Sequence, residues 1–394
     1  MKKSILISLI TALTLTVFSS CASKSQPVGG EVEDTTVTTV TSETTTPPPP
    51  ADSLVKITAA GDNLIHSSIY NQAKKRSTDG TYDFDYAYEN VEKLINGDIN
   101  ILNQETLVCN DVFEPSTYPC FNSPTQLGDK MISLGFNAFN LANNHCLDRG
   151  MKGSFAALDY WGGKNVITCG MYRNIEDRDK IRTLTKNDVT FSFLGFTEHT
   201  NGLRIAEDSE LEVVYTSDEA EIQREITEAS KISDMVVVSV HWGTENSHTI
   251  NDAQRALAQK MCDWGANIII GTHPHVIQGV EELTAADGRK TLVAYSLGNF
   301  ISAQDVNSRM IGGMLDFDVR KSYEKNTVTY ENVKFIPVVT HYDYSFSNIR
   351  IYPFSDYTNE LASKHGVNSK SPFSYDFIVQ TLKDNINEKY LALN

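Results

Sequence analysis

The chain has 394 residues, of which 40% are hydrophobic and 21% are charged, a composition typical of a globular protein and not of a disordered or fibrous one. Its 50 acidic residues outnumber 34 lysines and arginines, so the formal net charge is −16. Nucleic-acid binding needs clustered Lys and Arg against phosphates, and this balance excludes it while disfavouring a basic membrane-binding face. After the N-terminus there is no run of about 18 apolar residues, which excludes a polytopic membrane protein.

The first 21 residues have the pattern of a secretion signal. Two lysines precede an apolar stretch over residues 5–18, and two small serines lead to Cys21. A cysteine after a small pair resembles a bacterial lipobox, in which the thiol is acylated, although Phe18 is an unusual residue three positions earlier. The alternative is a plain signal peptide cleaved nearby. We predict a lipoprotein signal peptide over residues 1–21 and an extracytoplasmic protein anchored by lipid to the bacterial cell membrane.

Three further regions follow the signal. Residues 22–53 are rich in Thr and Pro, have no aromatic residue and cannot bury enough apolar surface to fold, which predicts a disordered tether. Residues 54–345 are predicted to form the folded domain. Residues 346–394 are predicted to form a C-terminal helical extension packed on that domain.

The folded part begins with alternating strand and helix patterns. Continuous apolar runs predict buried strands, and apolar residues at helical spacing predict amphipathic helices. Strands are expected at residues 54–62, 99–105, 136–145, 189–199, 234–243 and 267–275. Helices are expected at residues 84–96, 123–135, 217–233 and 252–265, with another through Phe155, Leu158 and Trp161. A turn at residues 186–188 indicates a hairpin before the fourth of these strands.

Past residue 275 the pattern changes. Strands joined by turns are expected at residues 276–283, 290–301, 310–320 and 327–342, so this half is predicted to be antiparallel, and residues 372–390 form a last amphipathic helix. The whole indicates an α/β protein in which a mixed sheet, covered by helices, packs on a second and more antiparallel sheet.

Five of the buried strands end in polar or imidazole-bearing clusters. Because ligands of open α/β sheets bind outside the carboxyl ends of the strands, these clusters are predicted to meet at one edge. They supply carboxylate, amide and imidazole groups without thiolates, a set that suits Zn²⁺, Mn²⁺ or Fe²⁺ in a hydrolytic site. The clusters are Gly61-Asp62-Asn63, Asn103-Gln104-Glu105, Asn143-Asn144-His145, His241-Trp242-Gly243 and Gly271-Thr272-His273-Pro274-His275.

Each cluster alone has a plainer interpretation. Gly61-Asp62 is the composition of an ordinary turn, the Asn143-Asn144-His145 cluster could cap a helix, and His241 could be a hydrogen-bonded core histidine. The pair His273 and His275 is a stronger indication, because two imidazoles one residue apart point the same way along an extended backbone. The ordered conjunction of all five clusters favours a metal site.

Five cysteines follow Cys21, so at least one of them is unpaired within the chain. Cys109 and Cys120 flank a turn-rich loop and are the predicted disulfide. No CxxC motif occurs, which gives no support to a thiolate zinc site or a thioredoxin-like redox site.

Six ordered motifs together resemble the capsule-synthesis CapA family, which is associated with bacterial poly-γ-glutamate capsules. The similarity runs from about residue 55 to about residue 305. That family is in turn similar to calcineurin-like metallophosphoesterases, and the resemblance implies a four-layer αββα sandwich around a two-metal site. The motifs are GDNLIH, NQET, NLANNHCLDRG, HWGTE, GTHPHVIQG and YSLGNF.

The resemblance also implies roles for single residues. The metal ligands would be Asp62, Glu105, Asn144, His241, His273 and His275, with Glu105 where phosphoesterases place a bridging aspartate. His145 would protonate the leaving group and Asp148 would orient it. Arg149, Glu245 and Asn299, in or beside the motifs, are candidates for substrate contact.

Two departures from the phosphoesterase pattern put a dinuclear mechanism in doubt. The Asp-x-His motif has Leu64 at its third position, and His66 would need a local bend to replace the missing imidazole. Glu105 is one methylene longer than aspartate. The sequence therefore leaves open whether the site binds one divalent ion or two.

The family resemblance leaves two classes of function open. The first is a metal-dependent hydrolase or transferase acting on an anionic envelope polymer or a phosphoester. A chain this acidic would repel such a polymer over most of its surface, so binding would need a local basic patch. The second is a non-catalytic accessory of a membrane synthase or export complex. The presence of both His145 and Asp148 favours catalysis, because a structural metal site needs no proton donor.

Overall fold

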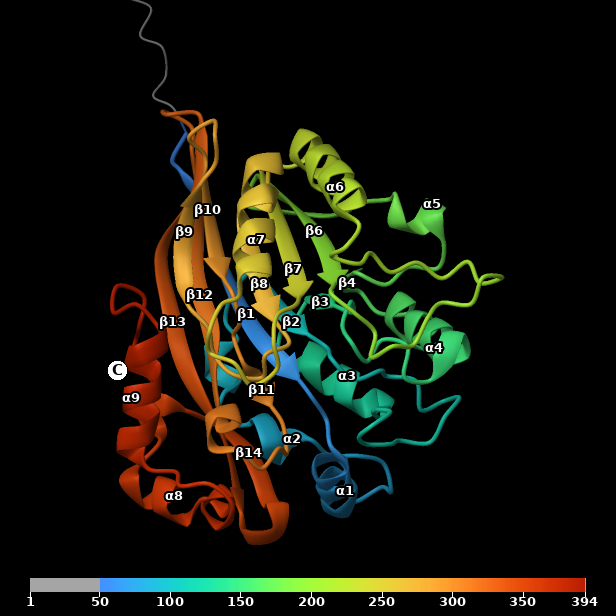
Figure 1. Cartoon of the computed structure of the whole chain (residues 1–394), viewed down its shortest axis with the longest axis vertical. Helices are drawn as coiled ribbons and strands as arrows, with labels where there is room; N and C mark the ends of the chain where they lie inside the picture. The colour runs from blue at the N-terminus through green and yellow to red at the C-terminus, as the bar shows by residue number, and fades with distance from the viewer. Residues whose placement is uncertain (1–49, 394) are drawn as a thin grey trace, which may run out of the picture. The chain divides into compact units, whose positions relative to one another are not determined.

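The computed structural model describes residues 50–393 (Figure 1). The predicted signal peptide and residues 22–49 of the predicted tether lie outside the described residues. In the part that is described, no helix combines the length and the apolar character that crossing a bilayer requires.

The larger of two sheets has eight strands. Its order is β14-β13-β12-β1-β2-β3-β4, and β11 pairs beside the end of β1. β1 to β4 are mutually parallel, β11 is parallel to β1, and β12 to β14 are antiparallel to their neighbours. The strands are β1 Ser53–Asn63, β2 Ile99–Asn103, β3 Ala138–Asn140, β4 Ile167–Cys169, β11 Asn299–Ile301, β12 Ile311–Ser322, β13 Thr327–Asp343 and β14 Ser347–Pro353.

The smaller sheet has six strands in the order β5-β6-β7-β8-β10-β9. Its four central strands are parallel, and the edge strands β5 and β9 are antiparallel to them. The strands are β5 Arg182–Lys186, β6 Val189–Thr197, β7 Met235–His241, β8 Ile268–Thr272, β9 Val280–Thr284 and β10 Lys290–Ala294. The predicted hairpin before residue 189 is confirmed by the β5–β6 pair.

Nine α-helices connect or flank the strands in the described residues. α7 begins with a capping box, in which Asn251 and Gln254 satisfy each other's backbone N–H groups. α6 is capped by Asp218 and has acidic residues in its first turn, as the helix dipole favours. The helices are α1 Ser67–Arg76, α2 Asp85–Tyr88, α3 Thr125–Ser133, α4 Gly150–Gly162, α5 Ile175–Arg178, α6 Glu219–Ile232, α7 Asp252–Trp264, α8 Asn359–Lys364 and α9 Tyr375–Asn385.

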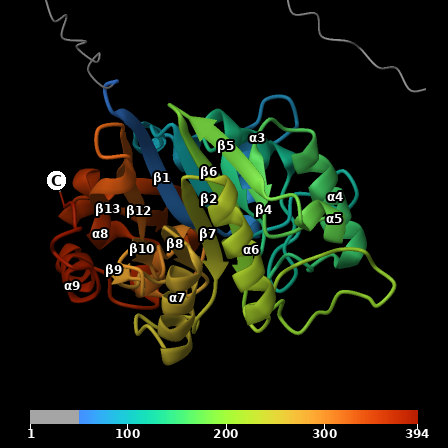
Figure 2. The same ribbon diagram turned by 90° about the horizontal axis from the view of Figure 1, so that it is seen from above.

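The two sheets pack face to face with helices outside them (Figure 2). α6 and α7 cover the smaller sheet through their own apolar cluster, which includes Ile226 and Met261. α3 and α4 cover the larger sheet, where the rings of Phe139 and Trp161 lie 4.5 Å apart. Burial of these apolar faces is the main stabilising term in such a fold. The predicted four-layer αββα sandwich is confirmed.

Several local predictions differ from the structure. The helix expected over residues 84–96 is interrupted near Asn90, whose side-chain amide donates to the carbonyl of Ile351 in β14. The second half is not purely antiparallel, because β10 runs parallel to β8 and β11 parallel to β1. The predicted helical extension over residues 346–394 begins with β14, an edge strand of the larger sheet.

The predicted Cys109–Cys120 disulfide is wrong, since both thiols are free. The Cys109 side chain is buried, and its thiol donates to Oδ1 of Asn122 at 3.1 Å. Cys120 is only partly buried at the other end of the loop.

Candidate metal centre

The polar clusters of both sheets meet at one edge of the sandwich. β1, β2 and β3 are parallel to one another in the larger sheet, as are β6, β7 and β8 in the smaller. The arrowheads of β1, β7 and β8 point toward the same end (Figure 1). The two sheets are linked there by the backbone N–H of His273, which donates to the Asp62 side chain. The His273 nitrogen lies 3.4 Å from each carboxylate oxygen of Asp62.

Glycines permit this close approach of the two sheets. A Cβ at Gly195 in β6 of the smaller sheet would lie 2.5 Å from Oδ1 of Asn140 in β3 of the larger sheet, and 2.7 Å from Cα of Gly170 after β4. His273 and His275 both have positive φ, 99° and 60°, so the extended backbone predicted for this pair is wrong. Positive φ costs most non-glycine residues energy, although His adopts it more often than most. The strained backbone turns both imidazoles into the same buried space.

Asp62, Glu105 and His275 form the centre of the cluster. One ligand atom from each lies within 4.8 Å of the others. Nδ1 of His275 is 3.1 Å from Oδ2 of Asp62, and its Nε2 is 3.8 Å from Oε1 of Glu105. Asn103 donates to the other carboxylate oxygen of Asp62 at 2.8 Å and so fixes its orientation.

His241, His273 and Asn144 adjoin this centre. Nε2 of His241 lies 2.9 Å from Oδ1 of Asn144, 3.1 Å from Nδ1 of His273 and 3.6 Å from Oε1 of Glu105. The structure therefore brings the six predicted ligand residues into one buried cluster.

The Glu105 side chain is the best test of whether a cation fits this cluster. Both of its carboxylate oxygens are buried, and neither has a hydrogen-bond partner in residues 50–393. Burial raises the pKa of Glu105 well above its usual range, and the nearby charge of Asp62 adds to the effect. A buried carboxylate without a partner is costly, and a bound dication removes that cost. The donor set and its burial fit a divalent metal.

Two of the imidazoles, those of His241 and His273, are in the protonation state that coordination needs. Burial lowers the pKa of His241 well below its usual range, and the neighbouring His273 and His275 contribute. Burial also lowers the pKa of His273 to about 2. Both rings are therefore neutral near pH 7, with nitrogen lone pairs available to a metal.

His145 and Asp148 form a separate pair beside the cluster. Oδ2 of Asp148 lies 2.7 Å from Nδ1 of His145 and accepts the backbone N–H of Phe121 at 2.6 Å. The Phe121 ring packs edge-on against the imidazole at 4.7 Å. This pair leaves Nε2 of His145 as the atom that can carry a proton to or from a bound molecule.

The three predicted substrate residues differ in their placement. Asn299 lies within the cluster, with Oδ1 3.1 Å from Nδ1 of His275. Arg149 is half-buried, its guanidinium lies over the Phe113 ring, and its Nε has no hydrogen-bond partner in the described chain. Glu245 is exposed on the segment after β7.

The departure at Leu64 is not compensated by His66. Nδ1 of His66 accepts the backbone N–H of Ala303 at 3.2 Å, and burial lowers the pKa of this histidine to about 4. His66 is not one of the three residues whose ligand atoms converge most closely.

Sequence reasoning assigned no role to three residues near the cluster. The His199 ring packs on His273 at 5.0 Å, and the Asn201 amide lies 3.4 Å from Nδ1 of His145. His199 follows a strand end, the same signal that pointed to His241. Arg309 is half-buried, and its Nε has no partner among residues 50–393, while its backbone carbonyl accepts from Asn299. No sequence signal pointed to Arg309.

Residues 56–304, more than half of the chain, match the family model described as bacterial capsule synthesis protein PGA_cap. The chain belongs to this family. The predicted CapA resemblance is thereby confirmed.

Two curated relatives are similar over about half of the chain. The PGA biosynthesis protein CapA of Bacillus subtilis (strain 168) is 34% identical over 190 residues, 48% of this chain and 48% of that protein. The capsule biosynthesis protein CapA of Bacillus anthracis is 30% identical over 190 residues, 47% of this chain and 45% of that protein. The match therefore spans about half the length of each curated relative.

Solved structures show looser likeness. A phosphatase from Mycoplasma pneumoniae has a TM-score of 0.44 and 11% identity, covering 73% of this chain and 95% of that one. The NAD nucleotidase NadN of Haemophilus influenzae has a TM-score of 0.44 and 12% identity, covering 87% of this chain and 64% of that one.

Proposed function

We propose that this PGA_cap family protein is a metal-dependent hydrolase or transferase acting in the synthesis, processing or anchoring of an anionic envelope polymer such as poly-γ-glutamate. The observation that carries the proposal is the unpartnered, buried Glu105 carboxylate among Asp62 and the imidazoles, next to the His145–Asp148 pair. A purely structural metal site would have no use for that pair.

Asp62, Glu105, Asn144, His241, His273 and His275 would hold one or two divalent ions, Zn²⁺, Mn²⁺ or Fe²⁺. A bound ion would supply Lewis-acid polarisation of the scissile carbonyl or phosphoryl group. The protein's own contribution is proton transfer. Asp148 holds the proton on Nδ1 of His145, and Nε2 then donates a proton to the departing atom.

A paired set of variants tests the proposal. Full-length protein and its His275→Ala and His145→Ala variants are assayed for metal by mass spectrometry and for turnover of phosphodiester, γ-glutamyl amide and muropeptide substrates. His275→Ala should lose metal, because that imidazole is at the centre of the cluster. His145→Ala should keep its metal and lose about 10²–10⁴-fold in turnover, the usual contribution of general acid catalysis.

His248→Ala is the matched control, because this imidazole lies outside the cluster and contacts the carbonyl of Ile277. It should retain both metal and turnover. A metal-loaded wild type that turns over none of these substrates would contradict the enzyme proposal and favour an accessory role in a synthase or export complex. A fully active His145→Ala would contradict the assigned proton donor.

We also propose that Cys21 is acylated and holds the domain at the outer side of the cell membrane. The support is the sequence pattern before Cys21. Cys21→Ser should shift the protein from the membrane fraction to the soluble fraction. Firm retention of Cys21→Ser in membranes would contradict the proposed anchor.

A further inference from the structure

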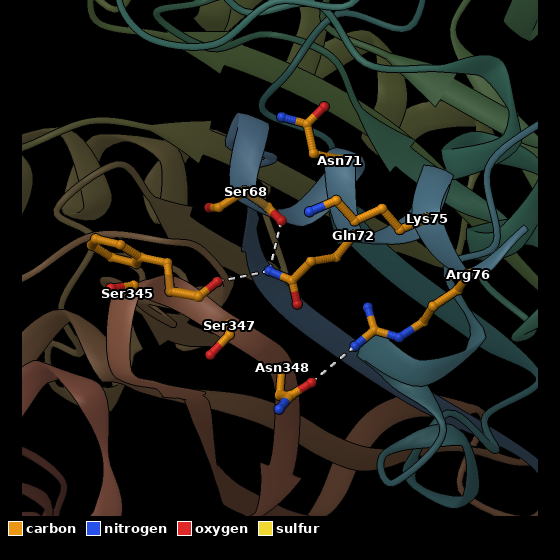
Figure 3. A pocket seen from close by; sticks show the side chains of 9 residues that line it. Ser68, Asn71, Gln72, Lys75, Arg76, Ser345, Ser347 and Asn348 are labelled. Atoms are coloured by element: carbon orange, nitrogen blue, oxygen red, sulfur yellow. Dashed lines mark hydrogen bonds between the residues drawn. The ribbon is translucent and has the colours of Figure 1, made fainter.

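A hollow of about 490 Å³ lies between helix α1 and the turn that joins β13 to β14 (Figure 3). It is separate from the metal-centre residues, and we call it the basic hollow. The residues that line it are Ser68, Asn71, Gln72, Lys75, Arg76, Ser345, Phe346, Ser347 and Asn348.

Gln72 ties the two walls of the basic hollow together. Its amide nitrogen donates to the carbonyl of Phe346 at 2.7 Å, and its amide oxygen accepts the N–H of Ile349 at 3.2 Å. Ser345, Phe346 and Asn348 in the facing turn all have positive φ. Only Asn adopts that conformation readily, so the turn is held by its contacts. The hollow is a built feature rather than a gap beside a loose loop.

The charge of the basic hollow differs from that of the rest of the chain. Lys75 and Arg76 belong to the last turn of α1, together with Lys74, and none of these three cations forms an ion pair within residues 50–393. No acidic residue is among those that line the hollow, although the chain carries 50 of them.

Figure 3 shows the Arg76 side chain extending from α1 toward Asn348 in the facing turn. Arg76 donates to Oδ1 of Asn348 at 3.3 Å, and its guanidinium stacks over the Tyr86 ring at 4.0 Å. The Asn348 amide in turn donates to Asp343, which does not line the hollow. Arg76 is therefore pre-positioned by neutral groups and keeps its charge unpaired.

The place of α1 relates the basic hollow to the metal centre. The helix is preceded by His66, only four residues after Asp62, and it runs for 10 residues. At about 1.5 Å per residue, its cationic end lies about 15 Å along the helix from that start. An extended α-linked chain covers about 3.3–3.6 Å per residue over three backbone bonds, and a γ-linked glutamate unit has five, so about three such units span the length of this helix.

We infer that the basic hollow binds carboxylates of an anionic polymer whose reacting bond lies at the metal centre. This rests on the proposed function and adds a subsite to it. The hollow supplies the local basic patch that an acidic protein needs in order to hold a polyanion. Its amides and hydroxyls form hydrogen bonds with the polymer's backbone, while Lys75 and Arg76 bind its free carboxylates.

Direct binding tests the inference. A synthetic γ-linked glutamate decamer is titrated into full-length protein by calorimetry at low salt. A γ-linked isoglutamine decamer, in which each free α-carboxylate is an amide, is the uncharged probe. The variants are Lys75→Gln alone and Lys75→Gln combined with Arg76→Gln. The matched control is Lys383→Gln, an exposed lysine in the last turn of another helix, α9, which does not line the hollow.

We expect the double variant to weaken binding of the glutamate decamer about tenfold in Kd, with a smaller loss for Lys75→Gln and no change for Lys383→Gln. Binding of the glutamate decamer should weaken with added salt, and the isoglutamine decamer should bind poorly at any salt. The melting temperature shows that each variant is folded.

Other outcomes separate this inference from the proposed function. A double variant that binds the decamer as tightly as wild type overturns the subsite, and so does a wild type that does not bind it at all. Absence of metal-dependent turnover with intact, Lys75-dependent binding would overturn the enzyme proposal and leave the subsite in place.

Discussion

Asp148 accepts two hydrogen bonds through one oxygen, from Nδ1 of His145 and from the backbone N–H of Phe121, with heavy-atom distances of 2.7 Å and 2.6 Å. The second bond locks the carboxylate, and the carboxylate in turn locks the imidazole against the Phe121 ring. A proton donor held this way needs no reorientation before it reacts, which is how outer partners tune a working histidine.

Asp148→Asn should therefore keep the fold and the metal while lowering turnover at least about tenfold. The amide of this variant can still accept a hydrogen bond from Phe121 or His145, but it has no negative charge to stabilise a positively charged His145 imidazole. Turnover and metal content are measured on the same sample. Asp208→Asn, an exposed residue of a surface loop, is the control and should match wild type. Unchanged turnover in Asp148→Asn would show that the pair has no catalytic role.

Glu105→Gln should have opposite effects with and without metal. In a chelator, the neutral amide removes the charge repulsion between Glu105 and Asp62 and should raise stability by about 1 kcal/mol. With metal added, the variant should gain less stability from the bound metal than wild type does, because a neutral amide binds a dication more weakly than a carboxylate does. Melting curves with EDTA and with Zn²⁺ or Mn²⁺ measure both effects.

Glu207→Gln, an exposed glutamate, controls for loss of one negative charge and should change neither curve. A lower melting temperature for Glu105→Gln than for wild type in EDTA would contradict the prediction, because it would mean that the Glu105 carboxylate stabilises the metal-free protein.

Much of the metal centre was predictable because it depends on topology. Asp62 and His241 lie at the carboxyl ends of β1 and β7, and His273 directly follows β8. Parallel strands in one sheet bring their carboxyl ends to one edge whatever the loops do. The same logic would have found His199, which follows β6. Arg309 could not be found, because its proximity to Asn299 depends on a short 3₁₀ helix, Asn307–Met310, before β12.

The errors share a physical cause, which is that spacing does not set the direction of a side chain in irregular backbone. Cys109 and Cys120 are close enough in sequence to pair, but the Cys109 thiol turns inward to Asn122. The helix expected over residues 84–96 has the right apolar spacing, yet the Asn90 amide bonds to β14 instead. Tertiary contacts decided both.

The thiols should react in an order that follows burial. Cys120 is partly exposed, whereas burial raises the pKa of Cys109 to about 11 and that of Cys146 to about 12. Because the thiolate is the reactive form, iodoacetamide should label Cys120 first in the folded protein. Peptide mapping after timed quenching measures the order. Recovery of Cys109 and Cys120 in one cross-linked peptide would contradict the free thiols.

The pH dependence of stability should carry a contribution from Glu225 on α6. Its side chain is buried, and its oxygens have no hydrogen-bond partner in the described chain, with Nε of Arg178 3.7 Å away. Burial raises the pKa of Glu225 from 4.5 to about 8, with the charge of Glu221 as the next cause. The unfolded chain loses this proton near its ordinary pKa, while the folded chain keeps it.

Between about pH 4.5 and 8 the folded state therefore binds more protons than the unfolded state, so stability falls as pH rises through this window. Glu225→Gln should remove that loss, and its advantage over wild type should grow by up to about 1.4 kcal/mol per pH unit until pH 8. Urea unfolding in EDTA at several pH values measures it, with Glu228→Gln, exposed on the same helix, as the control. If Glu225→Gln is less stable than wild type throughout the window, Arg178 and Arg224 hold the carboxylate ionised, and burial does not dominate.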